Sequence, residues 1–113
     1  MSDSKHSPLE ISVDRRGDDA IVVVNGEVDL ETSVVLSGTL AELNARHVTL
    51  DLTEVAYMDS TGLRAILVAK EDVERAGGTL DVSAASKIVS RLIEISGVGE
   101  LLGNGPIEPT TTP

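Results

Sequence analysis

Between residues 47 and 84 the sequence passes from a strand pattern to a helix pattern and back to a strand pattern. Apolar and polar residues alternate over 47–52. An amphipathic helix pattern follows over 60–76 after a short polar turn, and a second alternating segment covers 79–84. Two strands joined through a helix run parallel, because the helix carries the chain back along the sheet before the next strand begins. This segment therefore predicts an α/β fold with parallel strands.

Two further strands are expected before this unit. Residues 9, 11 and 13 are apolar and alternate with polar residues, which predicts a half-buried strand. Residues 20–24 are apolar without interruption, which predicts a strand buried on both faces. The polar turn at 15–19 is short enough for an antiparallel hairpin. Asn25 and Gly26 are expected to end the second strand.

Capping residues predict where the helices begin and end. Asp29 is expected to be the N-cap of a helix over about 30–44, and Gly77 with Gly78 to end the helix at 60–76. Ser86 is expected to cap a third helix that ends near residue 95, and a short helical turn is expected at 98–102. The apolar residues expected to pack on the sheet are Leu36, Leu40 and Leu43 with Val35 or Ala41 in the first helix, Leu63, Ile66, Leu67 and Val73 in the second, Leu80, Val82 and Ala84 in the last strand, and Ile88, Val89, Leu92, Ile93 and Ile95 in the third helix.

The predicted order of elements, β-β-α-β-α-β-α-α, describes a single α/β domain. It consists of a mixed sheet of four to five strands packed against about four helices. The length of 113 residues fits one domain. We place this domain at residues 9–103, after a flexible N-terminal tail at 1–8 and before a disordered C-terminal tail at 104–113.

Composition excludes several classes of function. The net charge of −10, from 9 basic and 19 acidic residues, argues against contact with nucleic acid or an anionic membrane surface. Tyr57 is the only aromatic residue, so there is no platform for stacking bases, and the absence of cysteine excludes disulfides and thiolate metal sites. No apolar run approaches the roughly 20 residues that cross a bilayer, and the N-terminus lacks the apolar segment of a signal peptide. We therefore expect a cytoplasmic protein.

The segment 55–63 places Ser60 in the first turn of a helix, directly after a strand. A serine nucleophile needs a nearby base, usually histidine. His6 belongs to the N-terminal tail, and His47 starts the strand whose other end leads to Ser60. The residues around Ser60 also lack the glycine spacing of a nucleophile elbow. We therefore expect no serine hydrolase and no catalytic residues.

No metal or cofactor is expected either. Glu27, Asp29 and Asp59 could converge, but neither a second histidine nor the spacing of a calcium loop accompanies them. The chain has no glycine-rich loop ending in Gly-Lys-Ser/Thr that would hold a phosphate. Caps and turns are the ordinary explanation for such carboxylates.

Two interpretations of the Ser60 segment remain open on local physics. In the first, which local physics favours, Asp59 or Ser60 caps the helix and Gly62 lets the turn pack closely. In the second, Ser60 accepts a phosphate. That group would add about two negative charges beside free N–H groups that can hold it, and its bulk would expel a partner.

Three segments of the chain resemble the anti-sigma factor antagonists, a branch of the STAS-domain family. Gly26-Glu27-Val28-Asp29 is similar to the family's Gly-Glu-Leu/Val-Asp signature after the second strand. The segment 51–63, with Met58-Asp59-Ser60-Thr61-Gly62-Leu63, is similar to its phosphorylation-site segment, and 77–97 to its last strand and helix. The resemblance covers roughly residues 8–102.

This resemblance implies a role in transcription regulation by partner switching. The unphosphorylated protein would bind an anti-sigma factor that is also a serine kinase, and so release a sigma factor. Phosphorylation of Ser60 would abolish binding, and a serine phosphatase would restore it. The protein would be a kinase substrate and not an enzyme. The partner-binding residues implied are Asp29, Asp59, Ser60, Thr61, Gly62 and Arg64.

Arg64 departs from the family pattern, in which a small residue is common at this position. Ser60 and Arg64 are four residues apart, so they can share a helix face, and Arg64 can pair with a phosphate on Ser60 or with an acidic group of the partner. A plain surface arginine is the alternative. We also expect Glu27, Asp29, Glu31 and Asp59 to gather near one sheet end.

Two other functions remain as alternatives. One is a non-phosphorylated STAS module, either a stressosome-type scaffold or an accessory subunit of a lipid-transport complex. The other is nucleotide binding or hydrolysis, which the absence of a phosphate-binding loop disfavours.

Overall fold

The computed structural model describes residues 9–99, which form one four-stranded sheet and three helices. The elements are β1 (Leu9–Arg16), β2 (Asp19–Val28), α1 (Ser33–Ala41), β3 (His47–Met58), α2 (Ser60–Arg75), β4 (Thr79–Ala85) and α3 (Lys87–Ser96). The strands lie side by side in the order β1-β2-β3-β4; β1 is antiparallel to β2, and β2, β3 and β4 are parallel. This confirms the predicted mixed sheet and the order of elements. The predicted tails and most of the helical turn at 98–102 lie outside the described residues.

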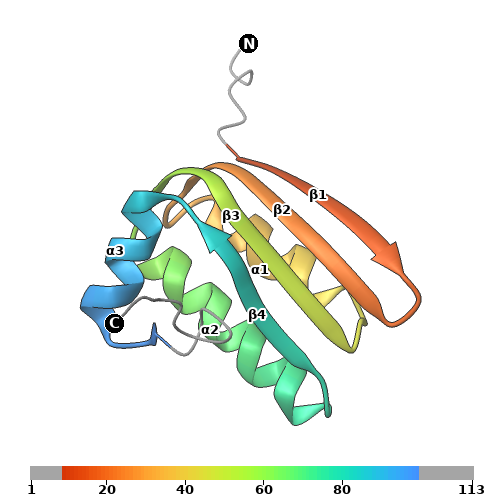
Figure 1. The fold of residues 1–113 in the computed structure, drawn as a ribbon. Coiled ribbons are helices and arrows are strands. Elements are labelled where there is room, and N and C mark those ends of the chain that lie inside the picture. Colours follow the sequence, from red (N-terminus) through yellow and green to blue (C-terminus); the bar gives the residue numbers. More distant parts are fainter. Residues whose placement is uncertain (1–8, 100–113) are drawn as a thin grey trace.

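All three helices pack on the same face of the sheet (Figure 1). Between the helices and the sheet lies an aliphatic core whose largest fully buried side chains are Leu36, Leu50, Leu52, Ile66, Leu80 and Ile93. Within residues 9–99, no helix is long and apolar enough to cross a membrane.

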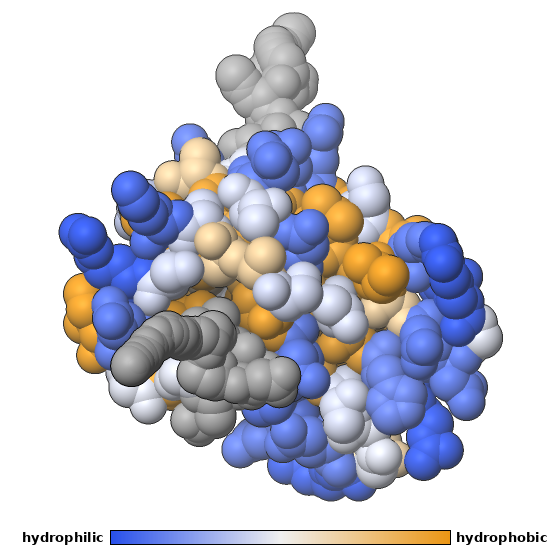
Figure 2. Space-filling model, in the orientation of Figure 1, coloured by the Kyte–Doolittle hydropathy of each residue, from blue (hydrophilic) through white to orange (hydrophobic). Residues whose placement is uncertain are grey.

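The prediction that 20–24 is buried on both faces is wrong. Ala20, Val22 and Val24 are buried under the helices, but Ile21 is 39% exposed and Val23 is only half-buried. On this second face Ile21 pairs with Thr49 of β3, and no described element covers the pair. Figure 2, in the orientation of Figure 1, shows hydrophilic residues mixed with apolar ones on the side of the molecule that faces the reader.

Both central strands continue beyond their predicted ends. Asn25 and Gly26 do not end β2, because register shifts between Val23 and Asn25 and between Gly26 and Glu27 let the strand bulge and continue. The segment predicted as a polar turn after Leu52 is the second half of β3, where Val55 and Met58 are buried. The bulged pairing carries β2 and β3 together to the point where α1 and α2 begin.

The first helix is shorter than predicted, and Asp29 is not its N-cap. The N-cap position is Thr32, and Asp29 instead accepts hydrogen bonds in the turn before the helix. Leu36, Leu40 and Leu43 are buried as predicted. Neither Val35 nor Ala41 joins them, since both are exposed.

The other two helices have the predicted ends. In the last turn of α2, Gly77 N–H donates to the Glu74 carbonyl over 3.0 Å and Gly78 N–H to the Val73 carbonyl over 2.9 Å, which is a Schellman motif. Gly77 has the positive φ of 93° that this motif requires of its glycine. Ser86 caps α3 by accepting from Val89 N–H.

Three further residues predicted to pack in the core do not do so: Ile88 and Ile95 in α3, and Ala84 in β4. Ile88 and Ile95 are 42% and 76% exposed, because α3 presents to the sheet only the side that carries Val89 and Ile93. A register shift in β4 pairs Ala84 with Asp51, so Ala85 takes the place beside Leu52 and packs against the core.

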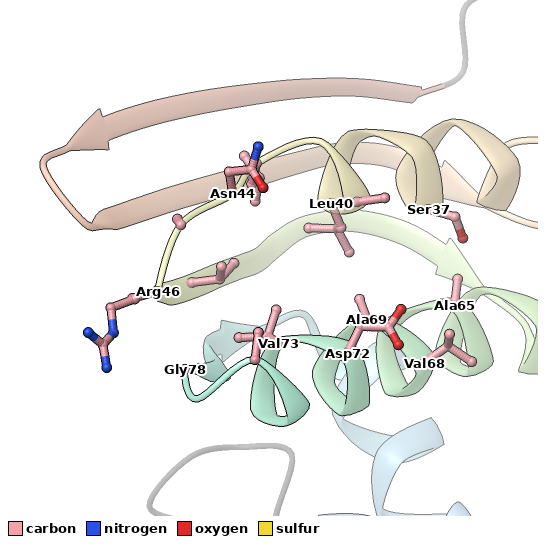
Figure 3. A pocket seen from close by; sticks show the side chains of 15 residues that line it. Ser37, Leu40, Asn44, Arg46, Ala65, Val68, Ala69, Asp72, Val73 and Gly78 are labelled. Carbon is pink, nitrogen blue, oxygen red and sulfur yellow. The ribbon is translucent and has the colours of Figure 1, made fainter.

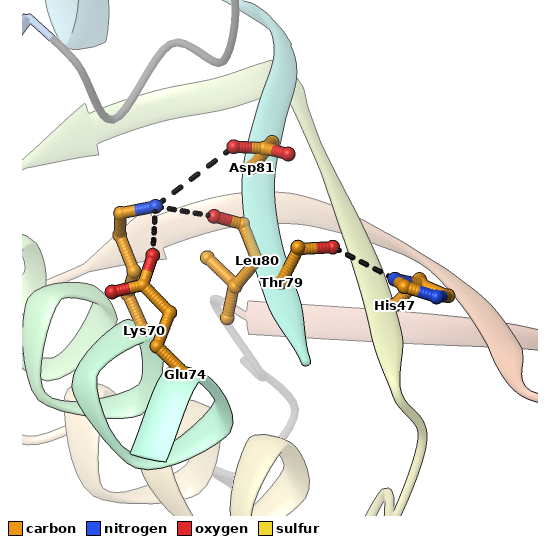
Figure 4. Close-up of polar contacts among 6 residues, drawn as sticks. All are labelled: His47, Lys70, Glu74, Thr79, Leu80 and Asp81. Atoms are coloured by element: carbon orange, nitrogen blue, oxygen red, sulfur yellow. Dashed lines mark hydrogen bonds and ion pairs between the residues drawn. The ribbon is translucent and has the colours of Figure 1, made fainter. Parts of the chain in front are cut away.

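Lys70 covers the open edge of the sheet at β4. Its ammonium group donates to the Leu80 carbonyl over 3.0 Å and lies 2.8 Å from Glu74 and 3.9 Å from Asp81 (Figure 4). Its side chain is 17% exposed. A charged lysine at a strand edge discourages pairing with another strand.

Candidate functional site

Asp59 caps α2 with a single carboxylate oxygen. Its Oδ1 accepts from Thr61 N–H over 3.0 Å and from Gly62 N–H over 3.2 Å, and the Thr61 hydroxyl donates to the same oxygen. Asp59 is extended, whereas Ser60 is the first helical residue. The local interpretation of this segment as a helix cap is therefore confirmed, with Asp59 as the capping residue.

Ser60 is exposed at this helix start, and its hydroxyl makes no hydrogen bond to another residue within 9–99. That free N–H groups hold a phosphate here stays a prediction, although two of the nearby amides are already bonded within the chain. The amides of Thr61 and Gly62 already donate to Asp59, and Leu63 N–H donates to the Asp59 carbonyl over 3.1 Å. A phosphate on Ser60 would therefore compete with the Asp59 oxygens for the amides of Thr61, Gly62 and Leu63.

Asp29 organises the turn between β2 and α1. Its Oδ1 accepts from Glu31 N–H and Thr32 N–H, each over 3.0 Å, and from the Thr32 hydroxyl over 3.1 Å. The Thr32 N–H bond is the largest reason why the pKa of the Asp29 carboxyl lies below its ordinary value of 3.8. Asp29 is therefore charged at neutral pH, and its charge is used to hold its own turn.

The sheet brings this turn and the start of α2 to the same end. Glu27 pairs with Tyr57 and Val28 with Met58 in the β2–β3 register, and Asp59 N–H donates to the Val28 carbonyl over 3.2 Å. The predicted gathering of acidic residues follows from this register, because Glu27, Asp29, Glu31 and Asp59 all lie at or just beyond these two strand ends.

Gly62 makes this junction close. A Cβ at position 62 would lie 2.6 Å from Val28 Cγ1 and 2.9 Å from Met58 Cγ. No side chain fits there without movement of its neighbours. The prediction that Gly62 lets the turn pack closely is confirmed, and the residue is needed for packing and not for a positive φ.

The remaining site residues differ in accessibility. Thr61 is half-buried with its hydroxyl committed to Asp59, whereas Arg64 is exposed one helical turn after Ser60. Arg64 makes no ion pair with another residue of the described range.

The one histidine among the described residues does not lie near Ser60. His47 begins β3, whose opposite end leads to Ser60, and its Nδ1 lies 3.0 Å from the Thr79 hydroxyl (Figure 4). His6 is outside the described residues. Within 9–99, no three acidic, histidine or cysteine side chains are arranged to hold a metal ion.

Sequence reasoning missed three exposed aliphatic residues next to the site. Leu30 is 72% exposed, Val34 69% and Val35 55%. Leu30 and Val34 fell within the helix predicted over about 30–44, but nothing was predicted about their exposure. Val35 was a candidate for the core. The available signal was the composition of α1, whose nine residues include no charged side chain at all.

A groove of about 470 Å³ lies elsewhere, between α1 and α2 (Figure 3). Leu40 and Ser37 line it from α1, and Ala65, Ala69 and Val73 from α2. None of the predicted site residues contributes to its wall. The groove and the Ser60 surface are therefore separate features.

Comparisons with known proteins agree with this architecture. The family described as "Mlab, STAS domain" matches residues 11–103. The anti-sigma-B factor antagonist of Bacillus subtilis (strain 168) is 30% identical over 96 residues, covering 83% of this chain and 88% of the relative. Its counterpart in Listeria monocytogenes is 31% identical over 98 residues, covering 83% and 86%.

Two solved structures share the fold. An anti-sigma factor antagonist from Mycobacterium paratuberculosis superimposes with a TM-score of 0.74 at 23% identity, over 90% of this chain and 86% of that one. The anti-sigma factor antagonist SpoIIAA in its unphosphorylated form gives 0.64 at 18% identity, over 82% and 84%.

Proposed function

The chain belongs to the STAS-domain family, and from this premise we propose that it is an anti-sigma factor antagonist controlled by phosphorylation of Ser60. In its unphosphorylated form it binds an anti-sigma factor that is also a serine kinase and so frees a sigma factor. A serine phosphatase reverses the modification. The proposal places these events in the cytoplasm, and the chain itself is a kinase substrate and not an enzyme.

One observation carries the proposal. Ser60 offers an exposed hydroxyl, without a hydrogen-bond partner among residues 9–99, on the first turn of a helix that Asp59 holds in place. A kinase needs its acceptor hydroxyl accessible and positioned, and this serine meets both conditions. The names of the curated relatives support the same role.

The cap also explains why a phosphate would end binding. The modification adds about two negative charges and three acceptor oxygens to the serine. Because Asp59 already accepts from the Thr61 and Gly62 amides, those oxygens would compete with a carboxylate for these two donors. The added charge also joins Glu27, Asp29 and Glu31 at this sheet end. The proposal directs the phosphate toward the partner, where its bulk opposes close contact.

In this proposal the partner contacts the surface around Asp29, Asp59, Ser60, Thr61, Gly62 and Arg64. Asp29, Thr61 and Gly62 act mainly by shaping the surface, since their groups bond or pack within the chain. Arg64 pairs with an acidic group of the partner or with the phosphate on Ser60. Unchanged phosphorylation rate, dephosphorylation rate and partner affinity in Arg64→Ala would contradict the role given to Arg64.

The experiment combines the protein, ATP and each purified serine-kinase anti-sigma factor from its own cell. Peptide mass spectrometry then locates any phosphate, and calorimetry measures binding. We expect phosphate on Ser60, none on the Ser60→Ala variant, and tight binding lost in Ser60→Asp. Thr61→Val tests a second acceptor and should leave Ser60 modified.

Modification only at other residues, or tight binding by Ser60→Asp, would contradict the proposal. Stable partner binding with no phosphate on Ser60 would favour a non-phosphorylated scaffold or accessory subunit. Turnover of ATP by the isolated chain would favour the nucleotide alternative.

A further inference from the structure

Two of the most exposed aliphatic side chains lie one helical turn apart beside the Ser60 surface. Ser33 N–H donates to the Asp29 carbonyl over 2.8 Å, so the chain already turns helically before α1 begins. Leu30 and Val34 are four residues apart across that turn and lie on the same side. They are 72% and 69% exposed. We call this pair the Leu30–Val34 strip.

The strip continues onto a helix that has no charged residue. A surface helix ordinarily carries charged residues toward solvent. The sequence of α1 is Ser-Val-Val-Leu-Ser-Gly-Thr-Leu-Ala, without one charged residue. In a chain with a net charge of −10, an uncharged and partly apolar surface of this kind is typical of a contact with another molecule.

Hydrogen bonds hold Leu30 outward. Asp29 accepts from Glu31 N–H and Thr32 N–H, the two amides that follow Leu30. The Thr32 hydroxyl donates to the Glu27 carbonyl over 2.8 Å, and Ser33 Oγ donates to the Leu30 carbonyl over 3.1 Å. The leucine therefore needs little ordering when it binds, which favours its use as an anchor.

The charges around the strip indicate the chemistry of its partner. Glu27, Asp29 and Glu31 flank Leu30 within five residues of sequence. A two-fold contact between copies of this chain would place the same acids opposite one another, so a second copy is disfavoured. An apolar pocket with lysine or arginine at its rim complements the strip.

We propose that the Leu30–Val34 strip is the apolar anchor by which the anti-sigma kinase recognises this chain, inserted into an apolar pocket with a basic rim. This inference rests on the proposed function, because it assigns the strip to the partner that modifies Ser60. The strip and Ser60 adjoin the same two strand ends, through the Asp59 N–H to Val28 carbonyl bond. One partner can therefore contact both.

The test uses the full chain and the kinase that phosphorylates Ser60. The variant is Leu30→Gln/Val34→Gln, which removes apolar contact without adding charge, and glutamine is a better helix former than valine at position 34. The matched control is Ile95→Gln, because Ile95 is 76% exposed on α3. We expect at least tenfold weaker binding and a KM raised by a similar factor at unchanged kcat for the strip variant only, since the lost contact acts equally on substrate and transition state. Thermal unfolding confirms that both variants are folded.

The outcomes separate this inference from the proposed function. Normal phosphorylation of Ser60 with equal affinity of the strip variant overturns the anchor and leaves the function standing. A wild-type chain that is neither bound nor phosphorylated overturns both. A wild-type dimer that the strip variant abolishes, seen by sedimentation, also overturns the anchor and assigns the strip to a second copy.

A salt series checks the basic rim. Glu27→Gln/Glu31→Gln should slow association severalfold at low salt and flatten its dependence on ionic strength, because the two glutamates attract the rim. Unchanged association with unchanged salt dependence would overturn the basic rim.

Discussion

Asp59 holds the first turn of α2 through one oxygen atom, and its removal should be measurable. Asp59→Ala leaves the amides of Thr61 and Gly62 without their acceptor. We expect it to lower the free energy of unfolding by about 1 kcal/mol, which is typical for loss of an N-cap. Urea denaturation checks this. Ser86→Ala removes a single acceptor at 3.4 Å in α3 and should cost less. Equal losses in the two variants would contradict the importance given to the Asp59 cap.

Asp29 should make stability depend on pH in acid. Its pKa is lowered in the folded chain, chiefly by the Thr32 N–H bond. Its contribution is therefore fully present above the pKa of the unfolded chain, near 4, and is lost as pH falls through the lower folded value.

The comparison is with Asp29→Asn, which keeps an oxygen acceptor but removes the titration. Its stability should fall less between pH 5 and about pH 2 than that of the wild type. Asp51, whose pKa is lowered by the Thr53 hydroxyl, remains in both proteins, so the difference between the two curves reports Asp29. Thermal unfolding at each pH measures the stability of both proteins. Parallel plots of stability against pH for the wild type and Asp29→Asn would contradict the prediction.

At the scale of elements, two helical glycines should respond oppositely to alanine. Gly62→Ala places a Cβ 2.6 Å from Val28 Cγ1, so we expect a loss of about 1–3 kcal/mol from overpacking. Gly38 in α1 has nothing within 4 Å of the same position. Gly38→Ala should therefore stabilise by about 0.5–1 kcal/mol through helix propensity alone. Chemical denaturation of both variants is sufficient, and a neutral Gly62→Ala would contradict the close junction.

Local signals predicted the ends of the second and third helices well, and the ends of the first helix and of the strands poorly. Gly77 and Ser86 act through their own turns, so their roles are visible in a few residues of sequence. The continuation of β2 past Gly26 depends on bulged pairing with β3, which is a contact between distant residues. Asp29 was predicted to be the N-cap of the first helix but bonds within the turn before it. An aspartate carboxylate accepts from nearby backbone N–H groups in both places, so the sequence alone does not separate a turn from a helix cap.

At the scale of the whole molecule, Lys70 should keep the sheet from growing. Lys70→Met retains the apolar stem but leaves the Leu80 carbonyl without the ammonium donor, at an edge no longer protected by the lysine. We expect increased self-association with rising concentration, measured by sedimentation velocity. Lys87→Met makes an equal change of charge on α3, and its self-association should not differ from that of the wild type. Identical behaviour of the two variants would contradict the role of Lys70.

The sequence did not show which faces of the sheet and helices are covered by another element, and this limited what could be predicted around the site. Periodicity shows which residues can be buried but not whether a second layer exists to bury them. Ile21, Val35 and Ile95 were all assigned to buried positions, and each faces a side that no described element covers. Ser60 was located correctly at the start of α2 because its position depends only on where that helix begins, which the local sequence pattern shows. The exposure of Leu30 could be found only from the folded chain.

The contact of Gly62 with Val28 also bears on how such proteins diverge. Where a genome carries several copies of one domain, each copy must avoid the partners of the others. A backbone junction with no free space cannot be adjusted to suit a new partner. Under the proposed function, discrimination would then depend on exposed side chains such as Leu30, Glu31 and Arg64, which can be exchanged without disturbing the junction. Duplicated genes can thus become insulated from crosstalk through a few surface substitutions while the fold stays constant.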